Sequence, residues 1–467
     1  MNAPTWIRDA IFYQIFPERF ANGDPSNDPP GSASWDEDMP TRENFFGGDL
    51  AGIAQHADHF QRLGVNALYL TPIFAAATNH KYDTQDYLSI DPAFGTLDTF
   101  RHLVSTLHDA QVRLVLDAVF NHCGDGFWAF QDVLEHGPAS RYWDWFIVDS
   151  YPIQFDPPSY QTCGGAPFLP KLNTNNPEVL AYVLEVARYW GALGIDGWRL
   201  DVPWKVEGPF WQAFKDTVLG LNPDSYLVAE VWRGTRDWLK GDRVHGVMNY
   251  RLRANILDYA VFDHMDAEDF DYEVRQLLSE HGETAPYHLT LLGCHDTPRI
   301  HTLCKGDTGR HLIALALQMT LPGVPMIYYG DEIGMEGEND PDCRRPMIWR
   351  EDRWNRTLFD ATCTLTRLRR EHPALRLGDV RTLRTFNGVY AYARTYEDDA
   401  VVVILNPRME QPSLRIPVGE VSGATHWRDA ITNARISAED GMISLLPLRS
   451  RSVYVLITDT QGETHNT

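Results

Sequence analysis

Four acidic residues lie in or directly after apolar, strand-like runs of the sequence. Asp117, Asp201, Glu230 and Asp296 belong to the runs at 114–120, 195–200, 226–232 and 288–294. Because the carboxyl ends of parallel strands meet at one rim, we expect these side chains to gather in one pocket. Converging carboxylates repel one another, so their convergence indicates a chemistry that needs several acids at once. Cleavage of the bond between two sugars is such a chemistry.

Asp201 and Glu230 form the best pair, because they follow consecutive strand-like runs. A retaining glycosidase needs a nucleophilic carboxylate and a proton-donating carboxyl roughly 5 to 5.5 Å apart, and neighbouring strands lie about 4.8 Å apart. Arg199 precedes Asp201 by two residues and therefore shares its face, so we expect it to lower the pKa of the nucleophile. Val231 and Trp232 give Glu230 the apolar surroundings that suit an acid.

His122 and His295 stand beside these acids and could hydrogen-bond sugar hydroxyls. Each residue taken alone has a structural alternative, since an acid at a strand end is commonly a helix N-cap or a salt-bridge partner. The joint set is much harder to explain in that way.

Strand-like and helix-like segments alternate around these residues. Apolar runs predict eight strands, near 11–16, 66–74, 113–121, 194–201, 225–232, 246–250, 288–296 and 324–332. Helical spacing of apolar residues in between, as at 97–111, 177–194 and 309–320, predicts crossover helices. The alternation predicts an α/β protein built on a closed (β/α)8 TIM barrel of parallel strands.

Two segments depart from this alternation. Residues 122–173 are rich in Gly, Pro and aromatic residues, which predicts a small subdomain inserted after the third strand, on the rim that carries the acids. Alternating patterns in 377–467 predict a C-terminal antiparallel β-sandwich domain. The barrel would then comprise 1–121 and 174–376.

Composition restricts the partners. The 467-residue chain has 41 basic and 64 acidic residues and a formal net charge of −23. Nucleic acid and anionic membrane surfaces require clustered Lys and Arg, so neither is an expected partner. The sequence shows no signal peptide and no stretch of about 18 uninterrupted apolar residues. The six cysteines form no CxxC pair, which favours reduced thiols and a cytoplasmic protein.

Four motifs, in their order and spacing, resemble the conserved regions of the α-amylase family of retaining glycoside hydrolases. They are DAVFNH (117–122), GWRLD (197–201), EVW (230–232) and HD (295–296). The resemblance extends through LTPIF (70–74), HKYDTQDYLSIDPAFGT (80–96) and PGVPMIYYGDEIGM (322–335), and so covers the whole barrel.

This resemblance implies a role for each matching residue. Asp201 would be the nucleophile, Glu230 the general acid/base, and Asp296 the carboxylate that stabilises the oxocarbenium-like transition state. The subsite of the cleaved glucose would be lined by Arg199, His122 and His295, with Tyr82 stacked beneath the sugar. Asp117 would orient Arg199.

Within the family, LPKLN (169–173) and NDPDCRR (339–345) resemble the cyclomaltodextrinase, neopullulanase and maltogenic amylase group. By that resemblance Asp340 and Arg344 grip the sugar on the non-reducing side. Two features differ: the first strand begins by Ile11, without the group's N-terminal β domain that builds a dimer, and VPWK (202–205) replaces VANE after the nucleophile. We therefore expect a monomer to be plausible.

Aromatic side chains on strand-end loops favour an oligosaccharide over a single sugar, since flat rings stack against sugar faces. Trp128, Trp204 and Trp232 are the candidates, although any of these rings could instead pack the inserted subdomain.

A loop rich in oxygen-bearing side chains suggests a calcium site. The expected ligands are Asn22, Asp24, Asn27, Asp28, the Gly47 carbonyl and Asp49. An ordinary turn uses the same residue types. The same ligand string resembles a structural calcium site of the cyclomaltodextrinase group, which favours bound Ca²⁺.

Three functions remain open at this point. The first is retaining hydrolysis of α-1,4-glucosidic bonds in maltooligosaccharides, cyclodextrins or related α-glucans. The second uses the same site for glycosyl transfer to another sugar, or as an α-glucosidase. The third, a catalytically inactive carbohydrate-binding scaffold, is disfavoured because none of the three acids is missing.

Overall fold

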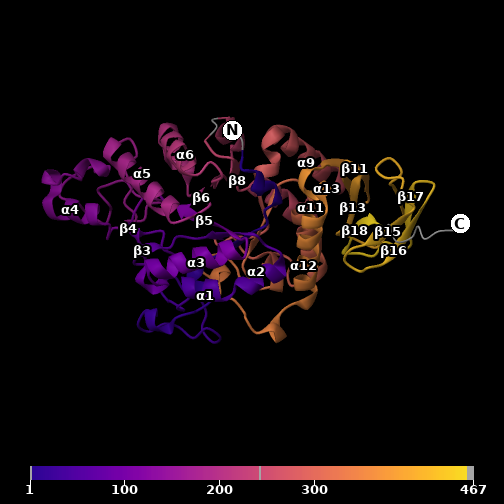
Figure 1. The fold of residues 1–467 in the computed structure, drawn as a ribbon, viewed down its shortest axis with the longest axis horizontal. Coiled ribbons are helices and arrows are strands. Elements are labelled where there is room, and N and C mark those ends of the chain that lie inside the picture. The colour runs from indigo at the N-terminus through magenta and orange to yellow at the C-terminus, as the bar shows by residue number, and fades with distance from the viewer. Residues whose placement is uncertain (1–2, 241–242, 460–467) are drawn as a thin grey trace.

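A barrel of parallel strands forms the body of the molecule. The computed structural model describes residues 3–240 and 243–459, and Figure 1 shows the barrel with a separate β domain beside it. The barrel strands are β1 (Phe12–Ile15), β2 (Ala67–Leu70), β5 (Arg113–Ala118), β6 (Gly197–Leu200), β7 (Tyr226–Ala229), β8 (Gly246–Val247), β9 (Leu289–Leu291) and β10 (Val324–Tyr328). All eight lie within the predicted strand segments.

Hydrogen bonding runs through the order β8-β7-β6-β5-β2-β1-β10-β9, and every pair along it is parallel. A parallel bridge between Met248 and Leu289 joins the two ends of this order. The predicted (β/α)8 barrel is thereby confirmed.

Helices cover the outside of the barrel. They are α1 (Leu50–Gln55), α2 (Ala57–Leu63), α3 (Leu97–Asp109), α5 (Pro177–Ala192), α6 (Gly208–Leu221), α7 (Thr235–Lys240), α8 (Tyr250–Ala260), α9 (Ala267–His281), α10 (Ile300–Leu303), α11 (Thr308–Thr320), α12 (Arg356–Glu371) and α13 (Pro373–Leu377). Local sequence explains several starts: Thr96 completes a capping box for α3, and Asn176 caps α5 ahead of Pro177.

The strands are buried on both faces, which explains their nearly continuous apolar sequence. Inward side chains, among them Phe12, Tyr69 and Met326, form the barrel interior. Their outward neighbours, such as Tyr13, Leu68 and Ile327, pack beneath the helices. This interior is a packed core, so only its carboxyl-end rim is available for a ligand.

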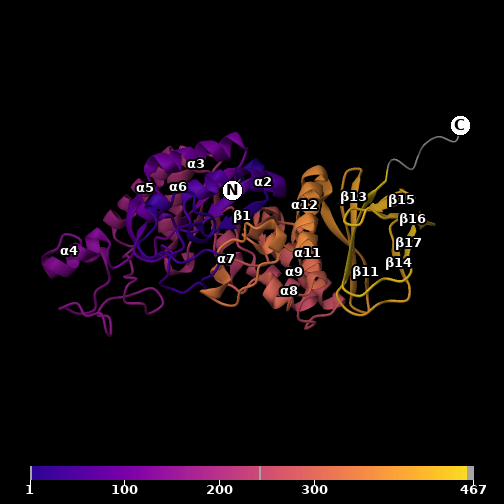
Figure 2. The same cartoon turned by 90° about the horizontal axis from the view of Figure 1, so that it is seen from below.

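Two excursions enlarge that rim. An antiparallel hairpin of β3 (Phe74–Ala76) and β4 (Thr84–Ile90), which the sequence did not predict, follows β2. The segment 122–173 follows β5 and contains one nine-residue helix, α4 (Trp128–His136). Isolated bridges such as His122 with Lys171 and Phe146 with Leu172 give it irregular β structure. In Figures 1 and 2, α4 lies at the end of the molecule away from the C-terminal sheet.

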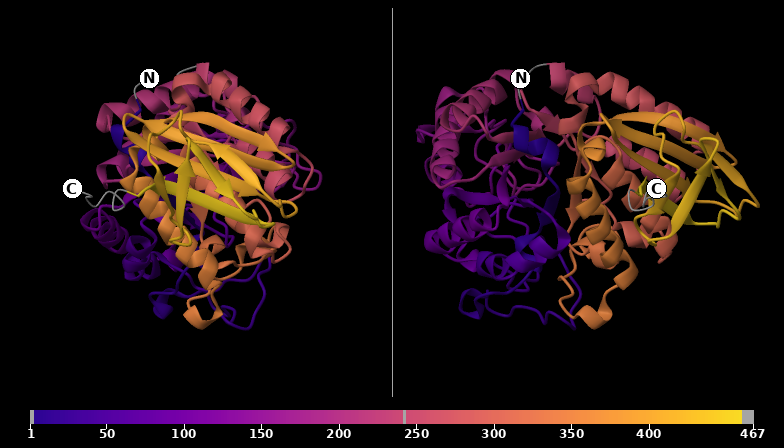
Figure 3. Two further views of the ribbon diagram at one scale, coloured as in Figure 1. Left: turned by 90° about the vertical axis from the view of Figure 1, so that its right-hand side faces the viewer. Right: turned by 45° about the vertical axis from the view of Figure 1, so that its right-hand side comes forward.

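The C-terminal segment folds into antiparallel strands, as predicted (Figure 3). They are β11 (Asp379–Phe386), β12 (Val389–Tyr396), β13 (Asp399–Asn406), β14 (Leu414–Pro417), β15 (His426–Asp429), β16 (Arg435–Glu439), β17 (Met442–Leu445) and β18 (Ser452–Thr458). Alternation in β12 and β13 explains the layering: Tyr390 and Val403 join the barrel-side core, and Ala391 and Ile404 face the second layer.

Helices α9 and α11 contact this domain, as Figure 2 also shows. The ends of the predicted domain ranges, residues 1–2 and 460–467, lie outside the described residues. Within the described residues no helix has the length and apolarity needed to cross a bilayer. None of the six cysteines forms a disulfide.

Gly197→Ala tests how closely the barrel strands must approach. An added Cβ would lie 2.2 Å from the Tyr226 carbonyl oxygen on β7, so we expect destabilisation of about 1–3 kcal/mol and a lower melting temperature. Gly220→Ala in α6 is the matched control, because no atom lies within 4 Å of its added Cβ. The control should gain about 0.4–1 kcal/mol through the unfolded state. Equal melting temperatures for the two variants would contradict this packing argument.

Candidate active site

The carboxyl ends of four barrel strands bring the predicted acids together. Asp117 lies at the end of β5, Asp201 directly after β6, Glu230 directly after β7, and Asp296 in the loop after β9. β5, β6 and β7 are hydrogen-bonded neighbours. The first three acids are buried, and the Asp296 side chain is 35% exposed.

Arg199 is the centre of this cluster. Its guanidinium Nη1 donates to both carboxylate oxygens of Asp117 at 2.9 and 3.0 Å and to Asp201 Oδ1 at 2.7 Å. Nη2 pairs with Glu230 Oε2 at 3.0 Å. One buried cation therefore contacts three of the four predicted acids.

The prediction that the pKa of Asp201 is lowered overall is wrong. Burial raises the pKa of Asp201 well above its usual range, and Arg199 opposes that rise. The nearby Glu230, Asp117 and Asp296 carboxylates act in the same direction as burial. Arg199 itself lowers the pKa of Asp201 as predicted, but desolvation, which the sequence does not reveal, is the larger effect here.

Tyr82 and His295 form a stacked pair at the centre of the rim. Their ring centroids lie 5.5 Å apart at an interplanar angle of 12°. The Tyr82 hydroxyl contacts Asp117 Oδ2 at 2.9 Å and His295 Nε2 at 2.6 Å. Gln14 on β1, which the sequence argument missed, holds His295 Nδ1 at 2.7 Å. Burial lowers the pKa of His295 well below its usual value, so the ring is neutral.

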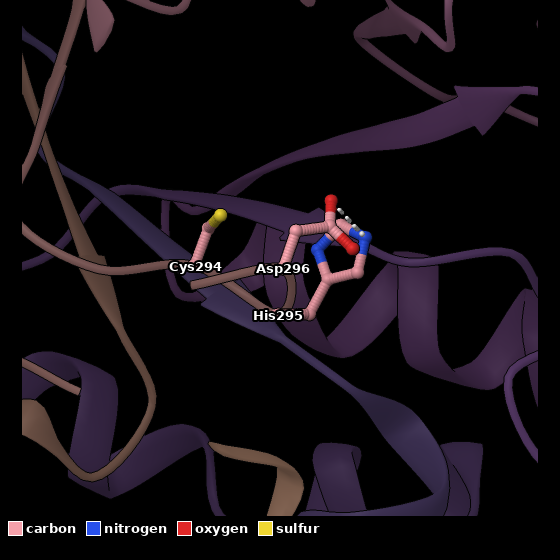
Figure 4. Close-up of side chains that lie close together, drawn as sticks. All are labelled: Cys294, His295 and Asp296. Carbon is pink, nitrogen blue, oxygen red and sulfur yellow. Dashed lines mark ion pairs between the residues drawn. The ribbon is translucent and has the colours of Figure 1, made fainter. Parts of the chain in front are cut away.

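Asp296 is held from two sides. His295 Nε2 lies 3.2 Å from Asp296 Oδ2, the contact drawn in Figure 4, and Arg344 Nη2 lies 3.3 Å from Oδ1. Arg344 also pairs with Asp340 at 2.8 Å and donates to the His295 carbonyl at 2.8 Å. The predicted Arg344 therefore contacts Asp296 directly, and Asp340 is joined to it through Arg344.

Cys294 precedes this pair, and the ligand-type atoms of Cys294, His295 and Asp296 all lie within 4.8 Å of one another. Burial raises the pKa of the Cys294 thiol to about 11. Metals bind the thiolate, so a neutral buried thiol is a poor ligand. We therefore interpret Cys294 as a structural side chain rather than a metal ligand.

Only one ring nitrogen of His122 has a side-chain hydrogen-bond partner among the described residues. Its Nδ1 contacts the Asn121 side chain at 3.1 Å, whereas its buried Nε2 has no hydrogen-bond partner among the described residues. A buried polar atom without a partner is costly, so this nitrogen is suited to a ligand hydroxyl.

Two cavities flank the acids. One, of about 490 Å³, is lined by Asp340 and Arg344 together with residues that the sequence argument missed, Arg19, Thr41, Arg42, Glu43, Thr78, Asn79, His80, Phe168 and Pro341. The other, of about 480 Å³, is lined by Trp232 and Tyr250 and by Arg233, Arg236, Arg251 and Arg253. Most residues of the first cavity lie on irregular loops, which no period in the sequence marked, whereas the second cavity is lined mainly by α7 and α8.

The three predicted rim tryptophans differ in their contacts. Trp128 begins α4 and packs against the Tyr142, Trp145 and Tyr182 rings, which is the structural alternative. Trp232 is 40% exposed, stacks on Tyr250 at 3.7 Å and 11°, and donates its indole N–H to Glu230 Oε1 at 2.7 Å. Trp204 is 46% exposed on the 3₁₀ turn directly after Asp201. Trp204 and Trp232 both lie on strand-end loops at the open rim.

The predicted calcium ligands also come together. Asn22 donates to Asp28 Oδ1 at 2.8 Å, and a Cβ added at Gly47 would lie 2.3 Å from that oxygen. Asp49 caps α1 and accepts from the Gly23 and Asp24 amides, while Asp24 accepts from Ser26. Asn22 Oδ1 and Asn27 Oδ1 are buried without hydrogen-bond partners. The hydrogen bonds of an ordinary turn account for the positions of Asp24 and Asp49. They do not account for the amide oxygens of Asn22 and Asn27, which are free to bind a cation.

Comparisons with known proteins agree with this geometry. Residues 14–366 match the family model described as alpha amylase, catalytic domain. Neopullulanase 2 of Thermoactinomyces vulgaris is 46% identical over 448 residues, which cover 95% of this chain and 76% of that protein. The cyclomaltodextrinase of Geobacillus thermopakistaniensis is 45% identical, with 94% of this chain and 75% of that protein covered.

A solved structure is similar along its whole length. The cyclic α-maltosyl-(1→6)-maltose hydrolase of Arthrobacter globiformis, in its ligand-free form, superimposes with a TM-score of 0.90 at 43% identity. The match covers 98% of this chain and 100% of that chain.

His122 should remain neutral far below the pH at which a free imidazole protonates. Burial lowers the pKa of His122 to about 4, so its ring nitrogens should titrate near that value in ¹⁵N NMR spectra. The spectrum of His122→Asn identifies the signal. A midpoint near 6.5 would show that the ring is solvated and would contradict the buried geometry.

Proposed function

Because the chain belongs to the α-amylase family, we propose that it is a retaining hydrolase of α-1,4-glucosidic bonds in maltooligosaccharides, cyclodextrins or related α-glucans. The observation that carries the proposal is the grouping of three carboxylates, Asp201, Glu230 and Asp296, around Arg199 and the Tyr82–His295 pair. The rim therefore carries every charged group that the mechanism requires.

The first step uses Asp201 and Glu230. Arg199 favours the ionised form of Asp201 against the opposing effect of burial. It also holds Asp201 Oδ1, so Oδ2 attacks the anomeric carbon. As that bond forms, the bond from the anomeric carbon to the glycosidic oxygen breaks, and Glu230 donates its proton to the departing oxygen. The products are a glycosyl ester on Asp201 and a free sugar with a new hydroxyl group.

The second step reverses these roles. Glu230, now a carboxylate, takes a proton from water, and the water oxygen attacks the anomeric carbon. The ester bond to Asp201 breaks, which restores both carboxyl groups. Two inversions at the same carbon give net retention.

Neighbouring residues act on the charge and position of the sugar. Asp296, partly exposed beside the buried pair, stabilises the positive charge that develops on the sugar ring. His122 Nε2, His295 and Arg199 lie where they can bind hydroxyls, and Tyr82 offers its ring. Asp340 and Arg344 bind the sugar on the non-reducing side, while Trp204 and Trp232 contact the leaving portion.

The substrate is expected to be a short or cyclic α-glucan. Similar proteins are named neopullulanase 2, cyclomaltodextrinase and cyclic α-maltosyl-(1→6)-maltose hydrolase. Glycosyl transfer, the alternative function, uses the same covalent ester and differs only in whether a sugar hydroxyl replaces water in the second step.

We also infer a structural calcium ion at the loop of Asn22, Asn27, Asp28 and Gly47. The two unpartnered amide oxygens support it, and burial raises the pKa of Asp28, with Asp49 and Asp24 adding to the rise. A hard, oxygen-seeking cation would satisfy these groups. When bound, the ion would fix the loop between β1 and α1 rather than take part in bond cleavage.

A cytoplasmic location belongs to the same proposal. All six cysteines are free, although an oxidising compartment favours disulfides. The expected partner is the carbohydrate itself.

Asp201→Asn should abolish turnover of maltotriose and β-cyclodextrin while leaving the fold intact. An amide cannot form the glycosyl ester, so kcat should fall by a factor on the order of 10⁴ or more. Trp6→Phe, at the other end of the barrel, is a control that should keep its rate. Normal turnover by Asp201→Asn would sink the proposal.

A substrate panel with product sizing defines the specificity. β-Cyclodextrin, pullulan, starch, maltotriose and cyclic α-maltosyl-(1→6)-maltose should differ in kcat/KM, with anomeric retention seen by ¹H NMR of fresh products. At high maltose concentration, longer or α-1,6-linked oligosaccharides would favour transfer over hydrolysis. An inverted anomer would exclude the two-step mechanism.

Removal of calcium should lower the melting temperature without abolishing catalysis. A ligand present at 100 times its Kd contributes about 2.7 kcal/mol to stability, so EDTA should lower Tm by several degrees. Added Ca²⁺ should restore Tm, and Asp28→Asn should blunt both effects. An EDTA response that is absent, or identical in the variant, would argue for an ordinary turn.

A further inference from the structure

Glu230 is held by donors on both of its oxygens. Val202 N–H donates to Oε2 at 3.0 Å, and Arg199 Nη2 lies 3.0 Å from the same oxygen. Oε1 receives the Trp232 indole N–H at 2.7 Å. The carboxyl group is 5% exposed, so protein donors replace most of its water.

The two oxygens are not equivalent. Oε2 faces a backbone amide on one strand end and a cation that is fixed by two other acids. A proton on that oxygen would oppose the amide donor and lie against the cation, so the transferable proton belongs on Oε1. Among the described residues, Trp232 is therefore the one hydrogen-bond partner of the oxygen that exchanges the proton.

Trp232 is itself held in place by its ring. It stacks face to face on Tyr250, with centroids 3.7 Å apart and planes 11° from parallel. Tyr250 is anchored in turn through its hydroxyl, 3.6 Å from Cys294 Sγ. Trp232 and Tyr250 also line the cavity of about 480 Å³. One side chain thus touches both the acid and the adjoining cavity.

We propose that Trp232 is a positioning residue that sets the proton balance of Glu230 through its indole N–H. This inference rests on the proposed function of Glu230 as the general acid/base. Donation to Oε1 favours the carboxylate, the form that the second step needs, and aims Oε1 at the place of the departing oxygen. Without the N–H, Glu230 holds its proton more tightly and transfers it less well to a poor leaving group.

Other charged or titratable groups face Glu230 and are unchanged by the test. They are Arg199 and Asp201 on the β6 end, Tyr250 on α8, His295 after β9 and Cys163 in the inserted segment. Asp296 acts in turn on Asp201, and Lys205 acts on Cys163. A shift that follows loss of one neutral N–H can therefore be assigned to that bond.

Trp232→Phe removes the N–H and keeps a ring to stack on Tyr250. The probes are 4-nitrophenyl and phenyl α-maltosides, which place nearly the same ring in the leaving position but differ in their need for a proton. Relative to wild type, kcat/KM should fall about tenfold more for the phenyl than for the nitrophenyl compound. The alkaline limb of the pH profile should move to higher pH.

Two further variants serve as a control and as a partial rescue. Trp6→Phe loses an indole N–H bond of 2.9 Å to a carbonyl far from the site and should leave both readouts at the wild-type value. Trp232→His returns a ring N–H and should recover part of the pH shift, with thermal melts showing that each variant is folded.

An equal loss on both maltosides with an unchanged pH profile would overturn the inference and leave Trp232 as a wall of the cavity. Failure of the proposed function looks different, because wild type itself would then release no phenol or Asp201→Asn would remain active.

Discussion

The ionic contacts of Arg199 are the constraint on which the rest of the site depends. Its guanidinium is 1% exposed, and moving a charge that deep costs several kcal/mol unless close partners satisfy it. Asp117, Asp201 and Glu230 supply those partners at 2.7 to 3.0 Å. The dependence is mutual, since three buried carboxylates without the cation would repel one another and retain protons.

Strand register fixes this cluster. Asp117 and Arg199 are direct partners across β5 and β6, and Leu200 pairs with Ala229 one step before Asp201 and Glu230. A slip of one residue would turn Arg199 to the outer face of the barrel and separate it from all three acids. The packed barrel interior, which makes such a slip costly, is therefore what holds the chemistry in place.

The sequence predicted most of the features that strand register controls. Eight apolar runs marked the barrel strands, and the acids at their ends marked the rim, because strand ends and burial leave a local pattern. Gln14 was missed, since a single amide inside an apolar strand gives no signal until β1 and the β9 loop meet. The β3–β4 hairpin was missed for a related reason: its pairing of Phe74 with Ile90 spans an irregular loop that carries Tyr82.

That hairpin shows how a loop acquires the precision of the barrel. Lys81, directly before Tyr82, has φ of 62° and is buried, with its ammonium 2.8 Å from Asp91 at the end of β4. The Phe45 and Phe94 rings lie 5.3 and 5.2 Å from the same nitrogen. A left-handed backbone at a side chain of this size persists only where surrounding contacts require it. Here they turn the Tyr82 hydroxyl toward Asp117.

Val202 extends the same argument to the reacting pair. It follows Asp201 directly and has φ of 34° and ψ of 49°, an unfavourable region for a β-branched residue. Strain of this kind costs on the order of 1–3 kcal/mol. The turn points the Val202 N–H across to Glu230 Oε2 on the next strand. Strand register fixes the backbone positions of the nucleophile and the acid but not their side chains. The strained turn at Val202 fixes one of those side chains, at a cost in the stability of the barrel.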